Sequence, residues 1–257
     1  MTRRPTQKTG ALVLRFLDYG ESDRIVTFYT ERFGKLKGIA KGARRSRKRF
    51  ANALELCTLL DIFFSRKSRD GLSLIEGCDV ITHYPAMRET LEASMAALYV
   101  IELVDHFTVE GKRNLPLFRL TQDVLGLLEG GTHIEETLRI FELRLLKLSG
   151  YDPFLEQCGL CMTPLDKMTA PSFHAATGGV RCRRCTGENG YSVPVSVGTL
   201  KTLLLGKTID IDKIPRLAFS ERTLKESSLM LGTFIRHILG KELKSLRVLN
   251  QFRRMGI

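Results

Sequence analysis

The chain has no apolar run long enough to cross a membrane. A membrane-spanning helix needs about 20 consecutive apolar residues, and no such run occurs among the 257 residues. The opening stretch MTRRPTQKTGALVLRF lacks the long apolar core of a secretory signal, because Arg15 and then Asp18 break the apolar run that begins at Ala11. We therefore expect a cytoplasmic protein without a membrane partner, in a compartment where thiols stay reduced.

The common catalytic signatures are also missing. The sequence holds no phosphate-binding glycine loop, no HExxH and no nucleophile elbow. Its five histidines are scattered, and the stretch GESD at residues 20–23 offers only two neighbouring carboxylates. A metal-dependent nuclease needs several convergent acids for Mg²⁺. We therefore predict that the protein is not an enzyme, and we keep a metal-dependent nuclease as a disfavoured alternative.

Acidic residues are absent from residues 35–49, although eight of these fifteen residues are Lys or Arg. The formal net charge of the chain is +12, and the excess lies in residues 1–80 and 196–257. Most charge runs are solvated faces without a ligand. Because this run is dense and unpaired in sequence, the basic loop at residues 42–50 favours nucleic-acid binding through phosphate contacts. Nearby aromatic residues could stack on bases, but we expect at least half of them to be core.

Residues 10–81 have the alternation and the β-branched composition of strands. Five short strands are expected, in GALVLRFLD, RIVTFYT, the segment after Gly34, LELCTLLDIFFS and LSLIEGCDVI, with a turn at Asp70-Gly71. This pattern predicts a small barrel of the oligonucleotide-binding (OB) type, with a split sandwich as the alternative.

From Pro85 the apolar period changes to that of helices. Helices are expected within residues 85–111, 115–131, 132–150, 195–206, 220–240 and 242–252. Thr132 and Glu135 resemble a capping box, and Ser220 is a candidate N-cap. The later helices are too few to form a core alone, so we expect them to pack on the earlier ones.

Four of the six cysteines form two CxxC motifs, CGLC and CRRC, separated by twenty residues. Each CxxC turn can place two thiolates on one side of a knuckle, and two facing knuckles make a tetrahedral site. We predict one structural Zn²⁺ bound by Cys158, Cys161, Cys182 and Cys185. Two disulfides would need an oxidising compartment, and a redox CxxC normally needs a βαβ context that is missing here. Cys57 and Cys78 lie in apolar patterns and are expected to be core thiols.

These features together predict an α+β multidomain protein. We expect an OB-fold barrel at residues 1–82, a helical domain formed by 83–150 and 196–257, and an inserted zinc module at 151–195. Within this module, Arg181, Arg183 and Arg184 could make a secondary nucleic-acid contact.

Several stretches resemble the RecO family of bacterial recombination mediators. They are GESDRIVTFYTERFGKLKGIAKGARR, FELRLLKLSGYDPFLEQCGLC and KELKSLRVL, and they occur in the same order as in that family. The resemblance implies an OB-fold, a helical domain and a zinc module. It also implies a non-enzymatic DNA repair and recombination protein that binds single- and double-stranded DNA and anneals complementary strands.

The resemblance further implies partners and contacts. The family works with RecR, binds the C-terminal tail of single-strand-binding protein (SSB) and acts indirectly on RecA, which implies a nucleoid-associated protein. Carried over by motif, the DNA contacts fall on Lys35, Lys37, Lys41, Arg44, Arg45, Arg47, Lys48 and Arg49, with Arg24 as a weaker candidate. Arg236 and Lys241 are hypothetical contacts for the SSB tail. The alternative function is a zinc-stapled protein-interaction scaffold without direct DNA binding.

Overall fold

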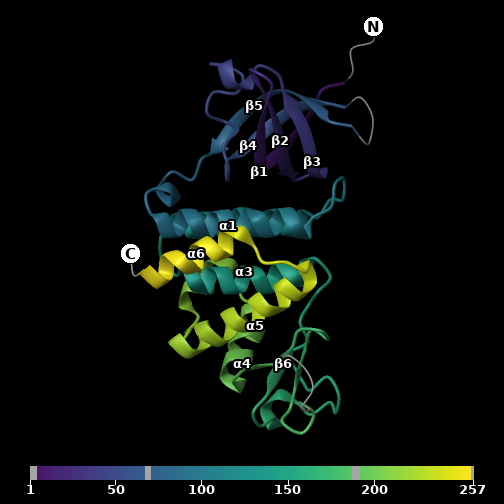
Figure 1. Cartoon of the computed structure of the whole chain (residues 1–257), viewed down its shortest axis with the longest axis vertical. Coiled ribbons are helices and arrows are strands. Elements are labelled where there is room, and N and C mark those ends of the chain that lie inside the picture. The colour runs from purple at the N-terminus through teal and green to yellow at the C-terminus, as the bar shows by residue number, and fades with distance from the viewer. Residues whose placement is uncertain (1–4, 67–70, 187–191, 256–257) are drawn as a thin grey trace. The chain divides into compact units, whose positions relative to one another are not determined.

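A computed structural model describes residues 5–66, 71–186 and 192–255, with side chains described up to residue 252. The chain divides into two compact units, Met1–Gly130 and Gly131–Ile257. The first unit contains the barrel and two helices, and the second contains the remaining helices and the cysteine module (Figure 1). This division has one boundary, so the three-part boundaries expected from the sequence stay a prediction.

Five strands form the closed barrel that the sequence predicted. Their bounds are β1 Gln7–Tyr19, β2 Asp23–Thr30, β3 Gly34–Ala40, β4 Leu59–Ser65 and β5 Ser73–Thr82. Their order is β1-β2-β3-β5-β4, closed by antiparallel pairing of β1 with β4, and only β3 and β5 run parallel. This is the five-stranded Greek-key order of an OB-fold. The split-sandwich alternative is therefore wrong.

Strand alternation fills the barrel interior. Val26, Phe28, Leu36, Ile62 and Phe64 all belong to one buried cluster. Residues two apart in a strand point to the same face, so this apolar set fixes which face is inside. The fourth strand begins at Leu59 and not at Leu54, because Cys57 has a φ of 61° that no strand can hold. Leu54 and Cys57 are buried before the strand begins.

Two helices of the first unit pack beside the barrel. They are α1 Leu91–Phe107 and α2 Leu115–Glu129, preceded by the short η2 Ala86–Arg88. Thr90 and Asn114 cap α1 and α2 with their side chains. The Tyr29 hydroxyl of β2 donates to the Asn114 carbonyl at 3.0 Å, and the Tyr29 and Phe118 rings lie 5.9 Å apart. These contacts attach β2 to the start of α2.

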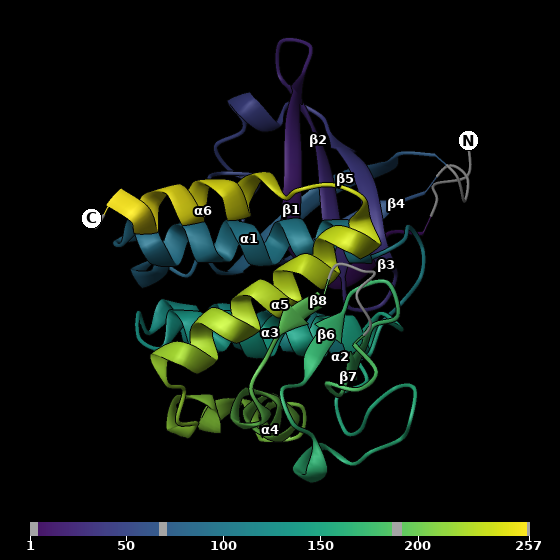
Figure 2. The same cartoon turned by 60° about the horizontal axis from the view of Figure 1, so that its bottom comes forward.

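The second unit has four α-helices among its described residues, α3 Ile134–Leu148, α4 Val197–Gly206, α5 Glu221–Leu239 and α6 Lys244–Met255, with η4 Ile211–Arg216 between α4 and α5. Helix α5 crosses α3 and also packs on α4 (Figure 2). Ser220 caps α5 as predicted. The predicted capping box at Thr132 is wrong, because α3 begins after His133, which is left-handed and makes no side-chain cap.

The cysteine module contains a small three-stranded sheet. Its strands are β6 Ser172–His174, β7 Gly179–Arg181 and β8 Ser192–Pro194, in the order β7-β6-β8, with η3 Leu165–Lys167 before them. The β6–β7 hairpin turns at Gly178, whose φ is 62°. Both strands of this hairpin lie between the two CxxC motifs.

The predicted turn at Asp70-Gly71 lies partly outside the described residues. Within the described part of the chain, no helix combines the length and the hydropathy that a membrane span requires.

Candidate nucleic-acid interface and metal site

The basic connector, defined here as residues 41–50, follows β3 and is held at both ends. At its start, the Gly42 amide donates to the Asp23 carboxylate at 2.8 Å, and the Arg44 amide donates to the Ser22 carbonyl at 3.0 Å. At its end, Phe50 is buried in the barrel core, and the Arg49 carbonyl accepts from the Cys78 amide at 3.3 Å. The connector is therefore anchored to the barrel, although its cationic side chains are exposed.

Four of the eight predicted DNA-contact residues have carboxylate partners. Lys35 is mostly buried and pairs with Asp105 at 3.1 Å. Lys37 pairs with Glu110 at 2.6 Å. On the connector, Arg44 pairs with Asp18 and Arg45 pairs with Glu21, both at 3.4 Å. The three pairs other than Lys35–Asp105 are solvent-exposed, and such pairs contribute little and exchange readily with other anions.

The other four predicted residues have no carboxylate partner among the described residues. Lys41, Arg47 and Lys48 are exposed and make no ion pair there. Arg49 donates to the Lys41 carbonyl at 3.1 Å and lies over the Phe50 ring at 5.2 Å. Arg49 therefore keeps its positive charge uncompensated while its side chain is held in place.

Arg24, the weaker candidate, has a structural environment. It pairs with Asp18 at 3.0 Å and with Glu55 at 2.9 Å, donates to the Leu54 carbonyl and lies 4.1 Å from the Phe16 ring centre. Together with the connector it lines a cavity of about 360 Å³. The positive charge of Arg24 is therefore compensated by Asp18 and Glu55, and Arg24 serves the local structure of the barrel.

The aromatic residues near the connector are mainly core. Phe28, Tyr29 and Phe50 are buried, and Phe33 packs partly against the core beside the Arg32 and Arg66 guanidinium groups. No aromatic stacking platform is therefore formed by Phe28, Tyr29 or Phe50.

The four cysteines of the two CxxC motifs come together as predicted. All four Sγ atoms lie within 4.8 Å of one another, and Cys161 Sγ lies 3.6 Å from Cys182 Sγ. A tetrahedral zinc site with Zn–S bonds of about 2.3 Å requires sulfur separations of about 3.8 Å. The four thiols can therefore hold a metal ion, and the all-sulfur set is compatible with zinc.

Local hydrogen bonds prepare two of these thiols to lose their protons. Hydrogen bonds from the Thr163 side chain and backbone lower the pKa of Cys161 to about 6. Burial opposes ionisation of Cys158, but backbone hydrogen bonds at Cys161, Cys182 and Leu160 outweigh it and lower its pKa. Thiolates are the form that binds metal. Four thiolate ligands would leave no open coordination position, so this site suits a structural ion.

Comparison with known proteins decides the family. Residues 1–84 match the family model described as Recombination protein O N terminal, and residues 88–247 match Recombination protein O C terminal. The chain belongs to the RecO family. Two relatives are described as DNA repair protein RecO. The one from Syntrophus aciditrophicus is 49% identical over the full length of both chains, and the one from Geobacter metallireducens is 37% identical over 95% of this chain and 97% of the relative. The relative in Dehalococcoides mccartyi strain 195 is 32% identical over all of both chains.

Membership of the RecO family supports a role in DNA repair and recombination.

The contacts of the first unit also show two acidic residues whose structural roles the sequence interpretation missed. Asp23 fixes the start of the connector through the Gly42 amide, and Asp105 neutralises Lys35. The stretch GESD had suggested a pair of acids, and its Asp23 and Glu21 in fact contact the connector. The signal for Asp23 lay in the RecO-like motif itself, whereas nothing local to Lys35 indicated Asp105.

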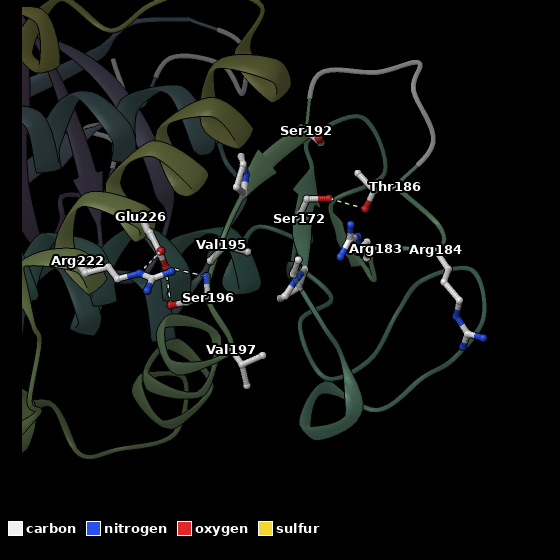
Figure 3. A pocket seen from close by; sticks show the side chains of 13 residues that line it. Ser172, Arg183, Arg184, Thr186, Ser192, Val195, Ser196, Val197, Arg222 and Glu226 are labelled. Atoms are coloured by element: carbon white, nitrogen blue, oxygen red, sulfur yellow. Dashed lines mark hydrogen bonds and ion pairs between the residues drawn. The ribbon is translucent and has the colours of Figure 1, made fainter.

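A second cavity lies beside the cysteine module of this RecO family member. It has a volume of about 800 Å³ and is bordered by the second CxxC motif, by β6 and β8, and by the starts of α4 and α5 (Figure 3). Three arginines line it, Arg183, Arg184 and Arg222, together with one acid, Glu226. Arg183 and Arg184 make no ion pair with any described residue, and Arg184 points away from Glu226 (Figure 3).

The carboxylate of Glu226, a residue of α5, is hydrogen-bonded at the start of α4. Its Oε2 accepts from the Ser196 amide and hydroxyl, both at 2.7 Å, and from the Thr199 hydroxyl at 2.6 Å, while Arg222 donates to Oε1 at 2.7 Å. Burial alone would raise its pKa, but these hydrogen bonds outweigh burial and lower the pKa to about 2. The carboxylate of Glu226, a residue of α5, therefore accepts the hydrogen bonds at the start of α4 and connects the two helices.

Proposed function

We propose that this protein is a non-enzymatic recombination mediator that holds DNA by its phosphates at the basic connector. It binds single- and double-stranded DNA, anneals complementary strands, and with RecR promotes loading of RecA on SSB-coated single strands. One structural Zn²⁺, bound by the four cysteines of the two CxxC motifs, stabilises the module that contains them.

The observation that carries this proposal is the uncompensated charge on an anchored segment. Lys41, Arg47, Lys48 and Arg49 lack carboxylate partners among the described residues, although the ten-residue connector is tied to the barrel at both ends. Cations that displace counterions from phosphate give affinity without reading sequence. A mediator that acts on any broken DNA needs affinity of this kind.

Annealing follows from the same charge. Two phosphate backbones repel each other, and a cationic surface that screens both lowers the free-energy cost of bringing them together. No covalent bond changes in this step, so no catalytic cluster is required. Arg44 and Arg45 can add to this surface, because their exposed pairs with Asp18 and Glu21 can exchange for phosphate.

Membership of the RecO family supports the proposed partners. RecR and the C-terminal tail of SSB are expected to bind this protein directly, and RecA is affected indirectly. Binding to chromosomal DNA would associate the protein with the nucleoid in the cytoplasm. Arg236 and Lys241, both exposed in the second unit, stay hypothetical contacts for the acidic SSB tail.

The test is DNA affinity as a function of salt concentration. For wild type, about five phosphate contacts on a single strand predict a log–log slope near −3.5. Replacing five connector cations by Ala, namely Arg44, Arg45, Arg47, Lys48 and Arg49, should abolish most of this slope while the melting temperature is retained. A matched control replaces five exposed cations of the second unit, namely Lys201, Lys213, Arg216, Lys225 and Arg247, and reaches the same formal net charge.

The results of these assays distinguish the proposed function from its alternatives. A wild-type slope near zero, or equal losses in both variants, rejects the connector as the DNA site. DNA binding that is weak from the start would favour the protein-interaction scaffold, in which Arg44 and Arg45 stay paired with Asp18 and Glu21. Reproducible cleavage of labelled DNA in Mg²⁺ or Mn²⁺ would overturn the non-enzymatic assignment. Annealing of SSB-coated strands, with and without RecR, tests the mediator step.

A further inference from the structure

The cavity beside the cysteine module, named here the module cavity, is large enough to enclose a small ligand. Its volume is about 800 Å³, and ligand sites in proteins commonly have volumes of about 300–1,000 Å³. Its lining comes from the second CxxC motif, from β6 and β8 with adjoining residues, and from the starts of α4 and α5 (Figure 3). All of these parts belong to the second unit, so the module cavity shares no residue with the basic connector.

The lining of the module cavity has an excess of positive charge. Three arginines and one glutamate line it, which leaves two positive charges in excess. The Glu226 carboxylate accepts hydrogen bonds from the Arg222 guanidinium and from the Ser196 amide, both at 2.7 Å, so Glu226 and Arg222 compensate each other. Arg183 and Arg184 are exposed and form no ion pair with a described residue. The excess charge is therefore on Arg183 and Arg184.

The backbone that presents these two arginines is fixed by hydrogen bonds. The Cys185 amide donates to the Cys182 carbonyl at 2.9 Å, and the Arg183 amide donates to the Thr169 carbonyl at 3.2 Å. The Thr186 hydroxyl donates to the same Cys182 carbonyl at 3.0 Å. Because this segment is already ordered, binding of an anion to its side chains would cost little backbone entropy.

Another part of the wall is apolar. Pro171 and Val195 are buried, Val197 is half-buried and Pro194 is exposed, and all four line the module cavity. A bare anion gains nothing from an apolar wall, so the ligand that suits this cavity also has an apolar part. The two prolines have no amide N–H, and the Val195 amide already donates to the Pro171 carbonyl at 3.1 Å. This wall is therefore poorly suited to pairing with the main chain of a bound peptide.

A nucleotide with a 5′-phosphomonoester has both chemical parts. A phosphomonoester carries a charge of about −1.5 to −2 at pH 7, which matches the two uncompensated arginines. Guanidinium groups bind phosphate oxygens through paired N–H donors. The flat face of a base is apolar and can contact a wall of proline and valine side chains. A phosphodiester carries one charge less, and a sugar phosphate has no such flat face.

We infer that the module cavity binds the 5′-terminal phosphate and the base of a nucleotide. Arg183 and Arg184 bind the phosphomonoester, and the apolar wall contacts the base. A free nucleoside monophosphate and the 5′-terminal nucleotide of a DNA strand both present this group. The inference does not rest on DNA binding at the connector, because no connector residue lines the module cavity.

The experiment is calorimetric titration of the full chain, as purified, with thymidine 5′-monophosphate, thymidine and inorganic phosphate. The variant carries Arg183→Gln and Arg184→Gln, which keep polar side chains of similar length and remove both charges. The matched control carries Lys225→Gln and Arg247→Gln, because these cations are exposed in the second unit and do not line the module cavity. Zinc content and melting temperature are measured for each protein, since the two arginines lie within a CxxC motif.

The expected result assigns each part of the ligand to its wall. Wild type should bind thymidine 5′-monophosphate at least about tenfold more tightly than thymidine or inorganic phosphate, because only the nucleotide uses both parts of the cavity. The arginine variant should bind the nucleotide about tenfold or more weakly, because its charge-assisted hydrogen bonds to phosphate are lost. The control pair should match wild type.

A second assay distinguishes the two sources of the nucleotide. It uses the five-alanine connector variant as background and compares oligothymidines that carry a 5′-phosphate or a 5′-hydroxyl, labelled at the 3′ end, by fluorescence anisotropy. Tighter binding of the 5′-phosphate strand that Arg183→Gln and Arg184→Gln abolish would assign the site to strand ends. Binding of the free nucleotide without an effect of the end group would assign it to free nucleotides.

Other results would overturn the inference. Thymidine or inorganic phosphate binding as tightly as the nucleotide, no binding of any of them, or equal losses in the control pair would each reject it. A tetraglutamate peptide that displaces the nucleotide at lower concentration would make the module cavity a peptide site. If the arginine variant loses zinc or melts below wild type, Ser192→Asp repeats the test, because it places a carboxylate in the same lining outside the CxxC motif. Unchanged nucleotide affinity in Ser192→Asp would reject the site.

Failure of this inference is distinguishable from failure of the proposed function. If wild type binds DNA with the expected salt slope but does not bind the nucleotide, the connector stands as the DNA site and the nucleotide site is rejected. If the nucleotide binds while DNA binding shows no salt dependence, the connector is rejected and the module cavity stands.

Discussion

Replacing Asp105 by Ala should destabilise the first unit by about 3 kcal/mol. The side chains of Lys35 and Asp105 are only 14% and 11% exposed, so removal of the carboxylate leaves a largely buried ammonium group without its counter-charge. Breaking a buried pair in this way costs about 3–5 kcal/mol. We expect the lower end, because Lys35 Nζ also donates to the Asp105 backbone carbonyl, which remains in the variant. The second partner, Arg15, is 71% exposed, and its loss adds at most about 0.5 kcal/mol.

The assay is thermal or urea unfolding of the full chain followed by circular dichroism. For a unit of about 130 residues, a loss of about 3 kcal/mol corresponds to a melting temperature lower by about 10 °C. Lys35→Met is the matched variant: it removes the buried charge, leaves Asp105 its pair with Arg15, and should cost at most about 1 kcal/mol. If Asp105→Ala costs less than about 1 kcal/mol, or if Lys35→Met is the worse of the two, the reasoning about the buried pair is refuted.

Three further predictions concern a close packing contact, the metal site and a buried carboxylate. Gly34→Ala should destabilise the barrel more than Gly20→Ala does, although both glycines have a positive φ. A Cβ at Gly34 would overlap the backbone of Lys112, whereas a Cβ at Gly20 would have no surrounding atom within 4 Å. Equal melting temperatures of the two variants would contradict this. Purified protein should contain one zinc ion per chain, and either a strong chelator or Cys161→Ser should release it and lower the melting temperature of the second unit, whereas retention of the metal would contradict the four-cysteine site. Because the folded-state pKa of Glu226 lies near 2, below its ordinary value, the stability it provides should be present above about pH 4.5 and lost as pH falls towards 2; Glu226→Gln should flatten the stability–pH curve in that window, and an unchanged curve would contradict the assignment.

The elements that could be predicted from the sequence are those whose signals are local. Alternating β-branched and aromatic residues identified the five strands, and the two CxxC spacings identified the four thiols that come together. Ser220 was recognised as an N-cap because a hydroxyl before a helix satisfies amides two or three residues later. Thr132 carried the same local signal, but the left-handed conformation of His133 begins α3 one residue later. Local signals therefore fail where one backbone conformation decides between two equal candidates.

Contacts between distant segments could not be predicted in this way. Lys35 and Asp105 are 70 positions apart, and only the packing of α1 beside the barrel brings them together. Leu17, Ile25, Ile39 and Leu74 are a similar case, since each has the sequence pattern of an ordinary apolar strand residue although they pair side by side in the barrel. Only the registers place them in one row, and a shift of one residue in any strand would move that strand's member to the interior.

The charge of a segment is therefore a poor measure of the charge that it offers to a ligand. Residues 35–49 contain no acid, but four of their eight cations meet carboxylates from the β1–β2 hairpin or from the α1 region. Buried and exposed ion pairs differ in how readily the cation can exchange its carboxylate partner for a phosphate. Lys35 cannot exchange Asp105 for phosphate without exposing a buried pair, whereas Arg44 and Arg45 can exchange their partners at little cost in free energy. If DNA binds at the connector as proposed, the charge that meets it should lie on Lys41, Arg47, Lys48 and Arg49, and Lys35 should serve the fold.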